Sequence, residues 1–423
     1  MGSGRMAGSK CHVKIKSNKE GIDVISRKLA SIVSGLSVLV LVAACSNGQG
    51  SQAVPTAVHQ PTSVVSSSPM PTDDNRGEAS ETEPPEAIEY ENKFDYDKLA
   101  GYEVVAEGLK VPWSIAADGD TFYISERGGS IVKLENGKQI RQQINISKDV
   151  KQTGESGFLG LVLSPDFSSN HEAFVYHTYE SNGNIVNRIV KLAEKSGQWS
   201  EVAVMLEGIP GAKYHDGGRL AIGPDGNLYA TTGDAQQPQL AQSKDSLAGK
   251  ILRMSIEGNI PADNPFEGSY IYSYGHRNPQ GLAWDEAGRL FETEHGPSGN
   301  PGGHDEINRI EAGNNFGWPA IIGDAEQAGM IAPLYHTGDP AIAPSGAAID
   351  GNGQLLFTTL VGETLYRYDT VNGGAPVPVL QGEGRLRDVL IHNGHIYVIT
   401  NNTDGRGSPS KTDDRLLVLK FEK

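Results

Sequence analysis

The stretch RLAIGPDGNLYA, residues 219–230, places an apolar strand, a Pro-Asp-Gly turn and a second apolar strand in immediate succession. The same pattern begins again near Trp113, Phe158, Gly281, Gly346 and Asp388. Each copy also contains a third run of alternating or β-branched residues, as expected of a strand. Repeats of roughly 40–65 residues built from short strands are typical of a β-propeller. The sequence therefore predicts an all-β, six-bladed β-propeller with four-stranded antiparallel blades.

The two ends of the repeat region suggest how the ring closes. The last repeat ends at Lys423 without a fourth strand, whereas an extra apolar run, Tyr102 to Ala106, precedes the first repeat. We expect the strand near residues 101–108 to join the last blade, because this covers an edge that would otherwise be open to aggregation. Pairing of this strand with the first blade would contradict the prediction.

The N-terminal segment 1–44 resembles a bacterial lipoprotein signal peptide. Arg27 and Lys28 precede an uncharged run up to Ala44, and small residues lead to Cys45. The run is shorter than the roughly 20 apolar residues of a membrane-spanning helix. We expect cleavage before Cys45 and lipidation of its thiol, with an ordinary signal peptide or an N-terminal anchor as alternatives. Such a protein is extracytoplasmic and attached to the cell membrane only through its lipid.

The segment 45–97 is rich in Pro, Ser, Thr and Glu and poor in large apolar residues. This composition buries too little surface to offset the entropy cost of ordering. We expect a disordered tether here, followed by the folded domain over residues 98–423.

Charge and cysteine content limit the possible partners. The net charge is −16, and segment 1–44 has seven Lys/Arg and two Asp/Glu, so the remainder is near −21. This argues against a nucleic-acid partner. The only cysteines are Cys11 and Cys45, so the folded domain has no disulfide.

In a propeller, the loops before the innermost strands and after the second strands open onto one end of the central channel. These loops carry the pairs Glu155-Ser156, His215-Asp216 and Arg277-Asn278, the run Glu294 to Pro297, and Arg385 and Arg387. Three arginines and two histidines at one end of an acidic protein favour a site for an anionic ligand. A solvated channel rim with scattered ion pairs is the alternative.

The same loops carry a family resemblance. The motifs are HDGGRL (215–220), YGHRNPQG (274–281), EHGP (294–297), DEIN (305–308), NFGWP (315–319) and GRLRD (384–388). Together they resemble the soluble quinoprotein glucose/sorbosone dehydrogenases, most of all the aldose sugar dehydrogenases, from about residue 103 to 423. The resemblance implies a six-bladed propeller that uses pyrroloquinoline quinone and calcium (Ca2+) to oxidise an aldose at C1 to a lactone.

The resemblance also implies roles for individual residues. His215 matches the general base that removes the hydroxyl proton while a hydride passes to the quinone. Arg277 matches the cation that stabilises charge on the reacting quinone oxygen. Asn278 matches a neighbouring cofactor contact, although a residue before Pro279 could also simply cap a β-bulge.

The calcium and the cofactor carboxylates have their own matches. Gly296 and Pro297 match backbone carbonyl ligands of the calcium, which prefers hard oxygen donors. Arg385 and Arg387 match a pair that binds the carboxylates, and spacing of two on a strand would place them on one face. A surface ion pair of these arginines with Glu383 or Asp388 is the alternative.

Two positions differ from the glucose-specific relatives, which carry glutamines there. Glu155 falls at the sugar site and His295 falls beside the calcium loop, so we assign Glu155 to the substrate and His295 to the cofactor. A clearer departure is Val361, where many relatives have a Lys or Arg that touches the cofactor. Arg127 is a candidate substitute for this cation.

Other readings stay open from the sequence. Asp305 and Glu306 could hold a second, structural calcium. A non-enzymatic propeller that binds a carbohydrate or a protein is one alternative, although the matched His and Arg set argues against it. A calcium-dependent lactonase is another, but it would need carboxylates around an axial metal, and only Glu155, Asp216 and Asp234 are suitably placed. The sequence does not name the sugar or the electron acceptor.

Overall fold

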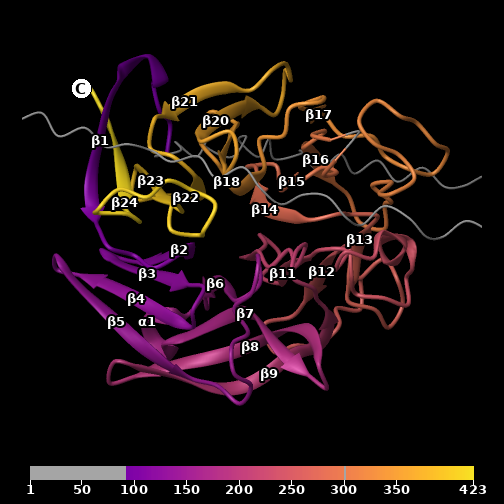
Figure 1. Ribbon diagram of the computed structural model, residues 1–423, viewed down its shortest axis with the longest axis horizontal. Helices are drawn as coiled ribbons and strands as arrows, with labels where there is room; N and C mark the ends of the chain where they lie inside the picture. The colour runs from indigo at the N-terminus through magenta and orange to yellow at the C-terminus, as the bar shows by residue number, and fades with distance from the viewer. Residues whose placement is uncertain (1–91, 300–301) are drawn as a thin grey trace, which may run out of the picture. The chain divides into compact units, whose positions relative to one another are not determined.

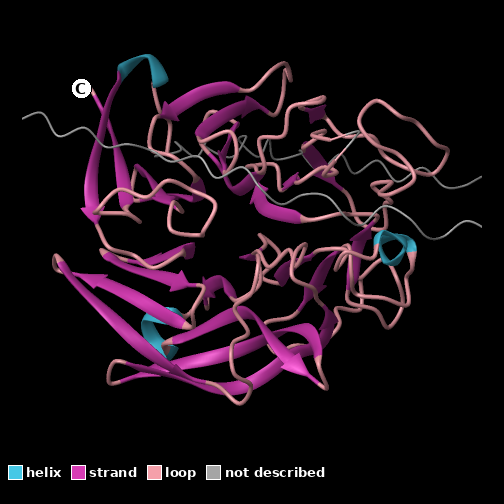
Figure 2. Ribbon diagram, viewed as in Figure 1, coloured by secondary structure: helices cyan, strands magenta, loops and turns pink. Residues whose placement is uncertain are grey.

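The computed structural model describes residues 92–299 and 302–423, which form an all-β domain (Figure 1). The predicted signal peptide, Cys45 and most of the predicted tether lie outside the described residues. Strands and loops dominate, and the helices are short (Figure 2). The helices are η1 (Tyr96–Lys98), α1 (Phe167–Asn170) and η2 (Pro238–Gln242). None of the helices in the described part of the chain has the length and apolar character needed to cross a membrane.

The first eight strands after β1 form one sheet in the order β2-β3-β4-β5-β9-β8-β7-β6. Their bounds are β2 Pro112–Asp118, β3 Thr121–Glu126, β4 Ser130–Glu135, β5 Lys138–Asn145, β6 Phe158–Leu163, β7 Glu172–Ser181, β8 Asn184–Lys195 and β9 Gln198–Pro210. The two halves of this sheet meet only through a short parallel pairing of β5 with β9, at Ile144–Trp199 and Asn145–Ser200. All the other pairings in the sheet are antiparallel.

Four four-stranded antiparallel sheets complete the domain. Their strands are β10 Leu220–Ile222, β11 Leu228–Thr232, β12 Lys250–Met254 and β13 Ile271–Tyr274; β14 Pro279–Trp284, β15 Leu290–Glu294, β16 Glu306–Ile310 and β17 Tyr335–His336; β18 Pro344–Ile349, β19 Gln354–Thr359, β20 Thr364–Asp369 and β21 Val377–Gln381; and β22 Leu386–His392, β23 His395–Thr400, β24 Leu416–Phe421 and β1 Leu99–Ala106. The sheets follow one another around a central axis, as in a propeller (Figure 1).

The predicted closure of the ring is confirmed. β1 pairs with β24 in antiparallel register, with Tyr102 opposite Leu419 and Val104 opposite Leu417. The packed chain also begins before the expected boundary at residue 98. Phe94 and Tyr96 pack against the apolar cluster of this last sheet, and the Tyr96 hydroxyl donates a hydrogen bond to Asp350 (2.6 Å).

Alternation along each strand explains why the sheets stack side by side. In β11, Leu228 and Ala230 pack into a cluster with β6 to β8, whereas Tyr229 packs into a cluster with Leu282 and Leu290 of the next sheet. Successive side chains of a strand point to opposite faces. Because a neighbouring sheet covers each face of β11, the strand carries apolar side chains on both faces. The core therefore lies between the sheets.

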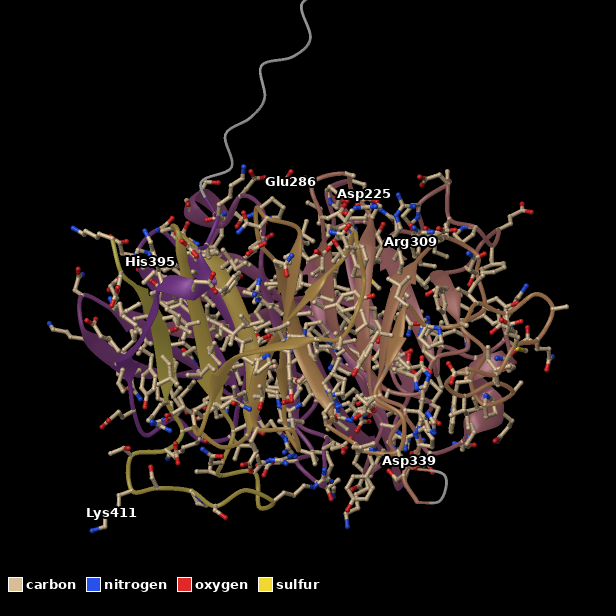
Figure 3. All side chains as sticks on the ribbon, turned by 90° about the horizontal axis from the view of Figure 1, so that it is seen from above. Asp225, Glu286, Arg309, Asp339, His395 and Lys411 are labelled. Carbon is tan, nitrogen blue, oxygen red and sulfur yellow. The ribbon has the colours of Figure 1, made fainter. Side chains whose placement is uncertain are left out.

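The hairpin turns and the loops of interest lie at opposite ends of the domain. Figure 3 shows Asp225 and Glu286, in the β10–β11 and β14–β15 turns, at one end and Asp339 at the other. At the latter end, the pairing between innermost and second strands is irregular in β2, β6, β14, β18 and β22. Bulges bend a strand locally and redirect its side chains. They occur where the predicted site residues enter the sheets.

Candidate active site

A cavity of about 430 Å³ opens at the loop end of the channel. Of the predicted site residues, Glu155, His215, Arg277, His295, Gly296, Pro297 and Arg385 line it. Asn278 and Arg387 lie close by but do not line it. A second cavity of about 520 Å³ adjoins the first, and the two share the wall formed by Glu155, His215, Arg277, Pro297, Ser298 and Arg406. The first is called the carbonyl-loop cavity and the second the aromatic cavity, after Gly296-Pro297 and the rings of Tyr214 and Trp318.

His215 is held in an uncommon backbone conformation, with φ at +66°. Its carbonyl accepts a hydrogen bond from the Ala235 amide (3.2 Å), and its own amide donates to Glu155 Oε2 (3.1 Å). A Cβ at Gly233 would lie 2.0 Å from the His215 carbonyl oxygen, so only glycine permits this approach. A left-handed conformation in a non-glycine residue is sustained only by such surrounding contacts, and here they orient the imidazole.

The contacts of the His215 ring determine its tautomer. Arg277 Nη2 lies 3.0 Å from Nε2, and Asp234 Oδ1 lies 2.8 Å from Nδ1. A guanidinium only donates hydrogen bonds, so Nε2 must accept and the neutral ring carries its proton on Nδ1. The Nδ1–H then donates to the Asp234 carboxylate. The single lone pair of Nε2 therefore faces the wall shared by the two cavities and is occupied by the Arg277 N–H, which a substrate hydroxyl would have to replace.

Asp234 is fixed in turn by other donors. The Trp318 indole N–H donates to Oδ2 (2.9 Å), and the Gln236 amide donates to Oδ1 (2.8 Å). A carboxylate that orients an imidazole and is itself buried stabilises the protonated ring that forms when the imidazole takes up a proton. The arrangement is that of a general base with its orienting acid.

Arg277 bridges the base and the carbonyl loop. Besides His215, it donates to the His295 carbonyl (3.1 Å) and Ser298 Oγ (3.3 Å), and its guanidinium lies 5.4 Å from the centre of the Trp318 ring. Burial lowers the pKa of Arg277, and nearby carboxylates only partly offset this. A cation held in this way is well placed to stabilise negative charge that develops beside His215.

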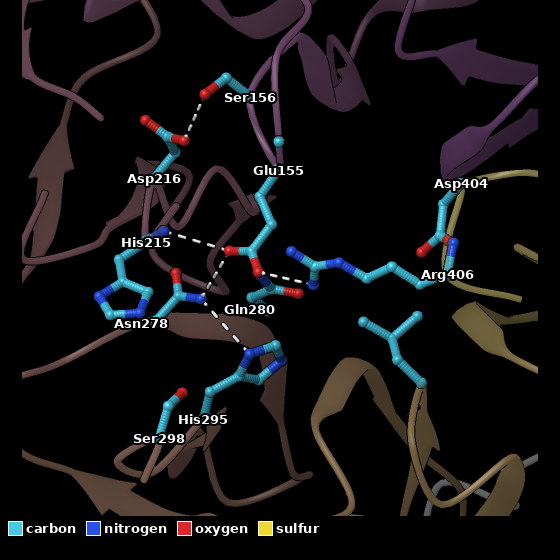
Figure 4. Close-up of polar contacts among 12 residues, drawn as sticks. Glu155, Ser156, His215, Asp216, Asn278, Gln280, His295, Ser298, Asp404 and Arg406 are labelled. Atoms are coloured by element: carbon cyan, nitrogen blue, oxygen red, sulfur yellow. Dashed lines mark hydrogen bonds and ion pairs between the residues drawn. The ribbon is translucent and has the colours of Figure 1, made fainter. Parts of the chain in front are cut away.

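Glu155 joins the base to a second arginine (Figure 4). Its Oε1 accepts from Arg406 Nη1 (3.1 Å), and its Oε2 accepts from the His215 amide. Burial alone would raise the pKa of Glu155. The positive charge of His295 at low pH, the hydrogen bond from the His215 amide and the charge of Arg406 together outweigh burial and lower this pKa to about 2. Glu155 is therefore a carboxylate at neutral pH.

Asn278 acts on the backbone beside the base. Its Oδ1 accepts from the Gly217 amide (3.0 Å), and its Nδ2 contacts Glu155 Oε2 and His295 Nδ1 (both 3.4 Å). It is fully buried. These contacts position the loop that carries His215, and the predicted contact of Asn278 with a cofactor stays a prediction.

The carbonyl loop has the features needed for a hard cation. Among the described residues, no hydrogen bond ends on the Gly296 or Pro297 carbonyl. The Gly296 amide donates to Asp305 Oδ1 (2.8 Å), and Asp305 Oδ2 holds the Ile342 and Ala343 amides (2.6 and 2.7 Å). A Cβ at Gly296 would lie 2.0 Å from the Gly303 carbonyl oxygen. The loop is thus clamped with two carbonyl oxygens left without donors, which fits calcium.

Both carboxylate oxygens of Asp305 therefore accept hydrogen bonds from backbone amides, which bears on the second calcium that the sequence leaves open. A different group, His276, Glu292 and Glu294, brings ligand atoms within 4.8 Å of one another. Burial raises the pKa of Glu294 to about 8. A second calcium near Asp305 and Glu306 stays a prediction.

The structure separates Arg385 from Arg387. A register shift between Leu386 and Asp388 interrupts the alternation of β22. Arg385 lines the carbonyl-loop cavity and pairs with Asp404 (2.8 Å). Arg387 lies deeper and donates to neutral oxygens only, on Gln280, Ser345 and Asn401. The alternative pairings are not formed, since Glu383 pairs with Arg415 and Asp388 with Arg219.

Unpaired nitrogens indicate that the deep part of the site suits an anion. Arg127 Nε, Arg387 Nε and His295 Nε2 are buried without a hydrogen-bond partner among the described residues. Burial, and then the charge of Arg127, lower the pKa of Arg387 to about 9. Buried cations without a carboxylate are costly unless a ligand supplies one. This set fits a cofactor with several carboxylates.

Arg406 is a site residue that was not predicted from the sequence. Val361, where many relatives have a cation, lines the carbonyl-loop cavity and is 57% exposed. Arg127, the candidate substitute for that cation, does not line this cavity and donates to the Gly154 and Ser156 carbonyls instead. Arg406 lines both cavities. Arg406 lies in the loop after β23, shortly after the channel-facing Asn401-Asn402. Its place in that loop was the only sequence signal that could have identified it.

Comparisons with known proteins agree with this geometry. A family model described as glucose/sorbosone dehydrogenase matches residues 109–417. The aldose sugar dehydrogenase of Escherichia coli is 30% identical over 343 residues, covering 72% of this chain and 90% of that protein. Quinoprotein glucose dehydrogenase B of Acinetobacter calcoaceticus is 35% identical over 271 residues, covering 55% of each chain. The PQQ-bound aldose sugar dehydrogenase of Streptomyces coelicolor is 38% identical with a TM-score of 0.70, covering 77% of this chain and 98% of that one. The chain therefore belongs to the glucose/sorbosone dehydrogenase family of oxidoreductases.

Proposed function

We propose that this protein oxidises aldose sugars at C1 to lactones, using pyrroloquinoline quinone and calcium, with His215 as the general base. The observation that carries the proposal is His215 Nε2, held as an acceptor on the wall shared by two cavities, where the C1 hydroxyl would replace the hydrogen bond from Arg277. The similarity to a quinoprotein glucose dehydrogenase and to a PQQ-bound aldose sugar dehydrogenase supports the choice of cofactor and substrate.

The chain's own residues account for the proton. The C1 hydroxyl gives its proton to His215 Nε2, and the Asp234 carboxylate stabilises the resulting imidazolium. The C1–H bond breaks as hydride, and a C=O bond forms at C1 to give the lactone. Pyrroloquinoline quinone, when bound, supplies the acceptor for the hydride. Arg277 would stabilise negative charge on the reacting oxygen of the quinone.

The cofactor would be held by residues in and around the carbonyl-loop cavity. The Gly296 and Pro297 carbonyls would bind calcium, and Arg385, Arg387, Asn278 and His295 would surround the quinone and its carboxylates. In the same proposal the eight-stranded sheet counts as two adjacent four-stranded blades, which makes six blades in all.

A lactonase function is less well supported. Its metal would need free side-chain carboxylates, but the three candidates are engaged. Asp216 accepts from Ser156, Asn187 and the Ala212 amide, Asp234 from the His215 ring, and Glu155 from Arg406. The free oxygens at the site are backbone carbonyls instead.

The experiment uses the full chain loaded with pyrroloquinoline quinone and calcium. Dye reduction is measured with a panel of aldoses, and the absorption spectrum reports bound quinone. We expect both a bound-quinone spectrum and aldose-dependent turnover. Absence of both would reject the proposal.

We also propose that the chain is an extracytoplasmic lipoprotein attached to the cell membrane at Cys45, with an electron acceptor still to be found. The motif leading to Cys45 supports this. Mass spectrometry of the mature N-terminus should show a lipid on Cys45, and Cys45→Ser should release the protein from membranes. A mature chain that begins elsewhere would contradict the anchor.

A further inference from the structure

An ion pair lies on the wall common to both cavities and plays no part in the proton step. Arg406 Nη1 lies 3.1 Å from Glu155 Oε1, and the two side chains are 46% and 18% exposed (Figure 4). Glu155 comes from the loop before β6 and Arg406 from the loop after β23. Residues so far apart in the chain meet only because both loops open onto the same end of the axis.

Both partners are held in place by further contacts. The Arg406 guanidinium lies 5.2 Å from the centre of the Tyr214 ring. Its backbone amide donates to Asp404 Oδ1 (2.8 Å), and Asp404 is paired with Arg385. On the other side, Glu155 accepts from the His215 amide. The pair is therefore a built part of the site, anchored to the base at one end and to an aromatic ring at the other.

The aromatic cavity has the composition of a sugar site. Tyr214 and Trp318 provide rings against which the C–H faces of a sugar can pack. Asp234, which also lines this cavity, is already engaged by His215 and Trp318. Arg277 also lines this cavity and is engaged by His215, the His295 carbonyl and Ser298. The charged groups left to meet the substrate are those of Glu155 and Arg406. They decide what charge the substrate can carry.

We propose that Arg406, through its ion pair with Glu155, is a specificity-determining residue that restricts the aromatic cavity to neutral aldoses and disfavours their uronic acids. The inference rests on the proposed function and deepens it. The pair has no net charge, and it offers both a donor and an acceptor to sugar hydroxyls. A sugar carboxylate would meet the negative Glu155 and find Arg406 already neutralised. Removal of the Glu155 charge frees the guanidinium, which suits a carboxylate.

The test compares sugars that differ only at C6: glucose with glucuronate, and galactose with galacturonate. The full chain, loaded with quinone and calcium, is assayed for kcat/KM with each sugar, and the ratio of the uronate value to the aldose value is compared between variants. Where the uronate is not oxidised, its affinity is measured as inhibition of aldose oxidation and takes the place of its kcat/KM. Glu155→Gln should raise the uronate-to-aldose ratio at least about tenfold, which is about 1.4 kcal/mol. Adding Arg406→Gln to that variant should remove the gain.

Arg406→Gln alone provides an independent arm. It leaves Glu155 without its cation, so the ratio should fall below that of the unaltered protein. Arg309→Gln is the matched control, because Arg309 pairs with Glu311 at the end of the domain opposite to Asp339 (Figure 3). It should leave the ratio unchanged.

The outcomes separate the two proposals. An unchanged ratio in Glu155→Gln, with aldoses still oxidised, overturns the inference and leaves the proposed function intact. If Glu155→Gln no longer binds quinone, the Arg406→Gln arm decides, and a ratio equal to or above that of the unaltered protein overturns the inference. Absence of both quinone binding and aldose turnover in the unaltered protein rejects the proposed function itself.

Discussion

The two ends of the central channel differ in how they pair buried charge. At the turn end, a cavity of about 450 Å³ is lined by apolar residues of the innermost strands together with Arg219 and Asp388. Arg219 pairs with Asp388 (3.0 Å), donates to the Gln280 carbonyl and Ser114 Oγ, and lies 4.2 Å from the centre of the Trp113 ring. Its charge is matched within the protein.

Arg387 lies 5.7 Å from the centre of the same Trp113 ring. Among the described residues, neither Arg387 nor Arg127 has a carboxylate partner. Breaking a matched buried pair leaves an uncompensated charge, whereas a buried cation without a carboxylate can be stabilised by an anionic ligand. In the proposed function, the anionic ligand binds at the loop end, whereas the charge pair at the turn end is structural.

The largest expected effect is at the loop end. His215→Ala should lower kcat about 10²–10⁴-fold, because the proton of the C1 hydroxyl loses its acceptor. Quinone binding, followed by its spectrum, should be retained. His395→Ala, at the end where Asp225 lies, should leave turnover unchanged (Figure 3). Equal activity of His215→Ala and the unaltered protein would show that the base is misassigned.

A matched pair of arginine variants tests the comparison directly. Arg219→Gln should lower the free energy of unfolding by about 3–5 kcal/mol, because it leaves Asp388 buried and unpaired. Arg387→Gln should cost little stability but should weaken quinone binding tenfold or more, at about 1.5–3 kcal/mol for a charged hydrogen bond. Chemical unfolding and quinone titration measure the two effects. The reverse pattern would contradict the division between the two ends.

The buried acids differ in the same way. Burial raises the pKa of both acids. Arg219 opposes this at Asp388, whereas Asp216 at the loop end has only uncharged donors and its pKa rises to about 6. The folded state therefore keeps this proton up to higher pH than the unfolded state. Its stabilising contribution is complete below about pH 4 and is lost as the pH rises through 6.

Asp216→Asn removes this titration. Its free energy of unfolding, relative to the unaltered protein, should rise by about 2 kcal/mol between pH 4 and pH 7. Chemical unfolding across this range measures the difference. Asp120→Asn, at an exposed turn, should show no such trend. A difference that does not depend on pH would contradict the raised pKa.

The smallest effect concerns the rim of the loop end. Val361→Lys adds a cation beside the carbonyl-loop cavity and should tighten binding of the anionic quinone by up to about fivefold, as expected for an exposed charge. Equilibrium titration with quinone measures it. Val371→Lys, at an exposed position outside both cavities, is the control. An equal gain in both variants would reveal only a general effect of net charge.

Much of the fold follows from local pattern. Strand alternation and turn residues predicted the innermost strands, the third strands and the closing pairing of Tyr102 with the last sheet, which the structure confirms. The predicted residues His215, Arg277 and Gly296-Pro297 do meet around one cavity. They could be placed together because every repeat brings the same loop to the same end of the axis.

The division between Arg385 and Arg387 could not be predicted. A spacing of two suggests one face of a strand, but the bulge after Leu386 breaks the alternation, and bulges have no simple sequence signal. Arg406 was missed for a related reason. It lies in an irregular loop, where periodicity says nothing about the direction of a side chain.

The sequence by itself determined the strands, their turns and the end of the channel at which chemistry is possible, because these depend on neighbouring residues and on a period of two. Only the tertiary structure decided which charges meet. Arg219 finds Asp388, Arg406 finds Glu155, and Arg387 finds no carboxylate among the described residues. Charge pairing depends on distance in space and on burial, and neither is encoded in the spacing of residues along the chain.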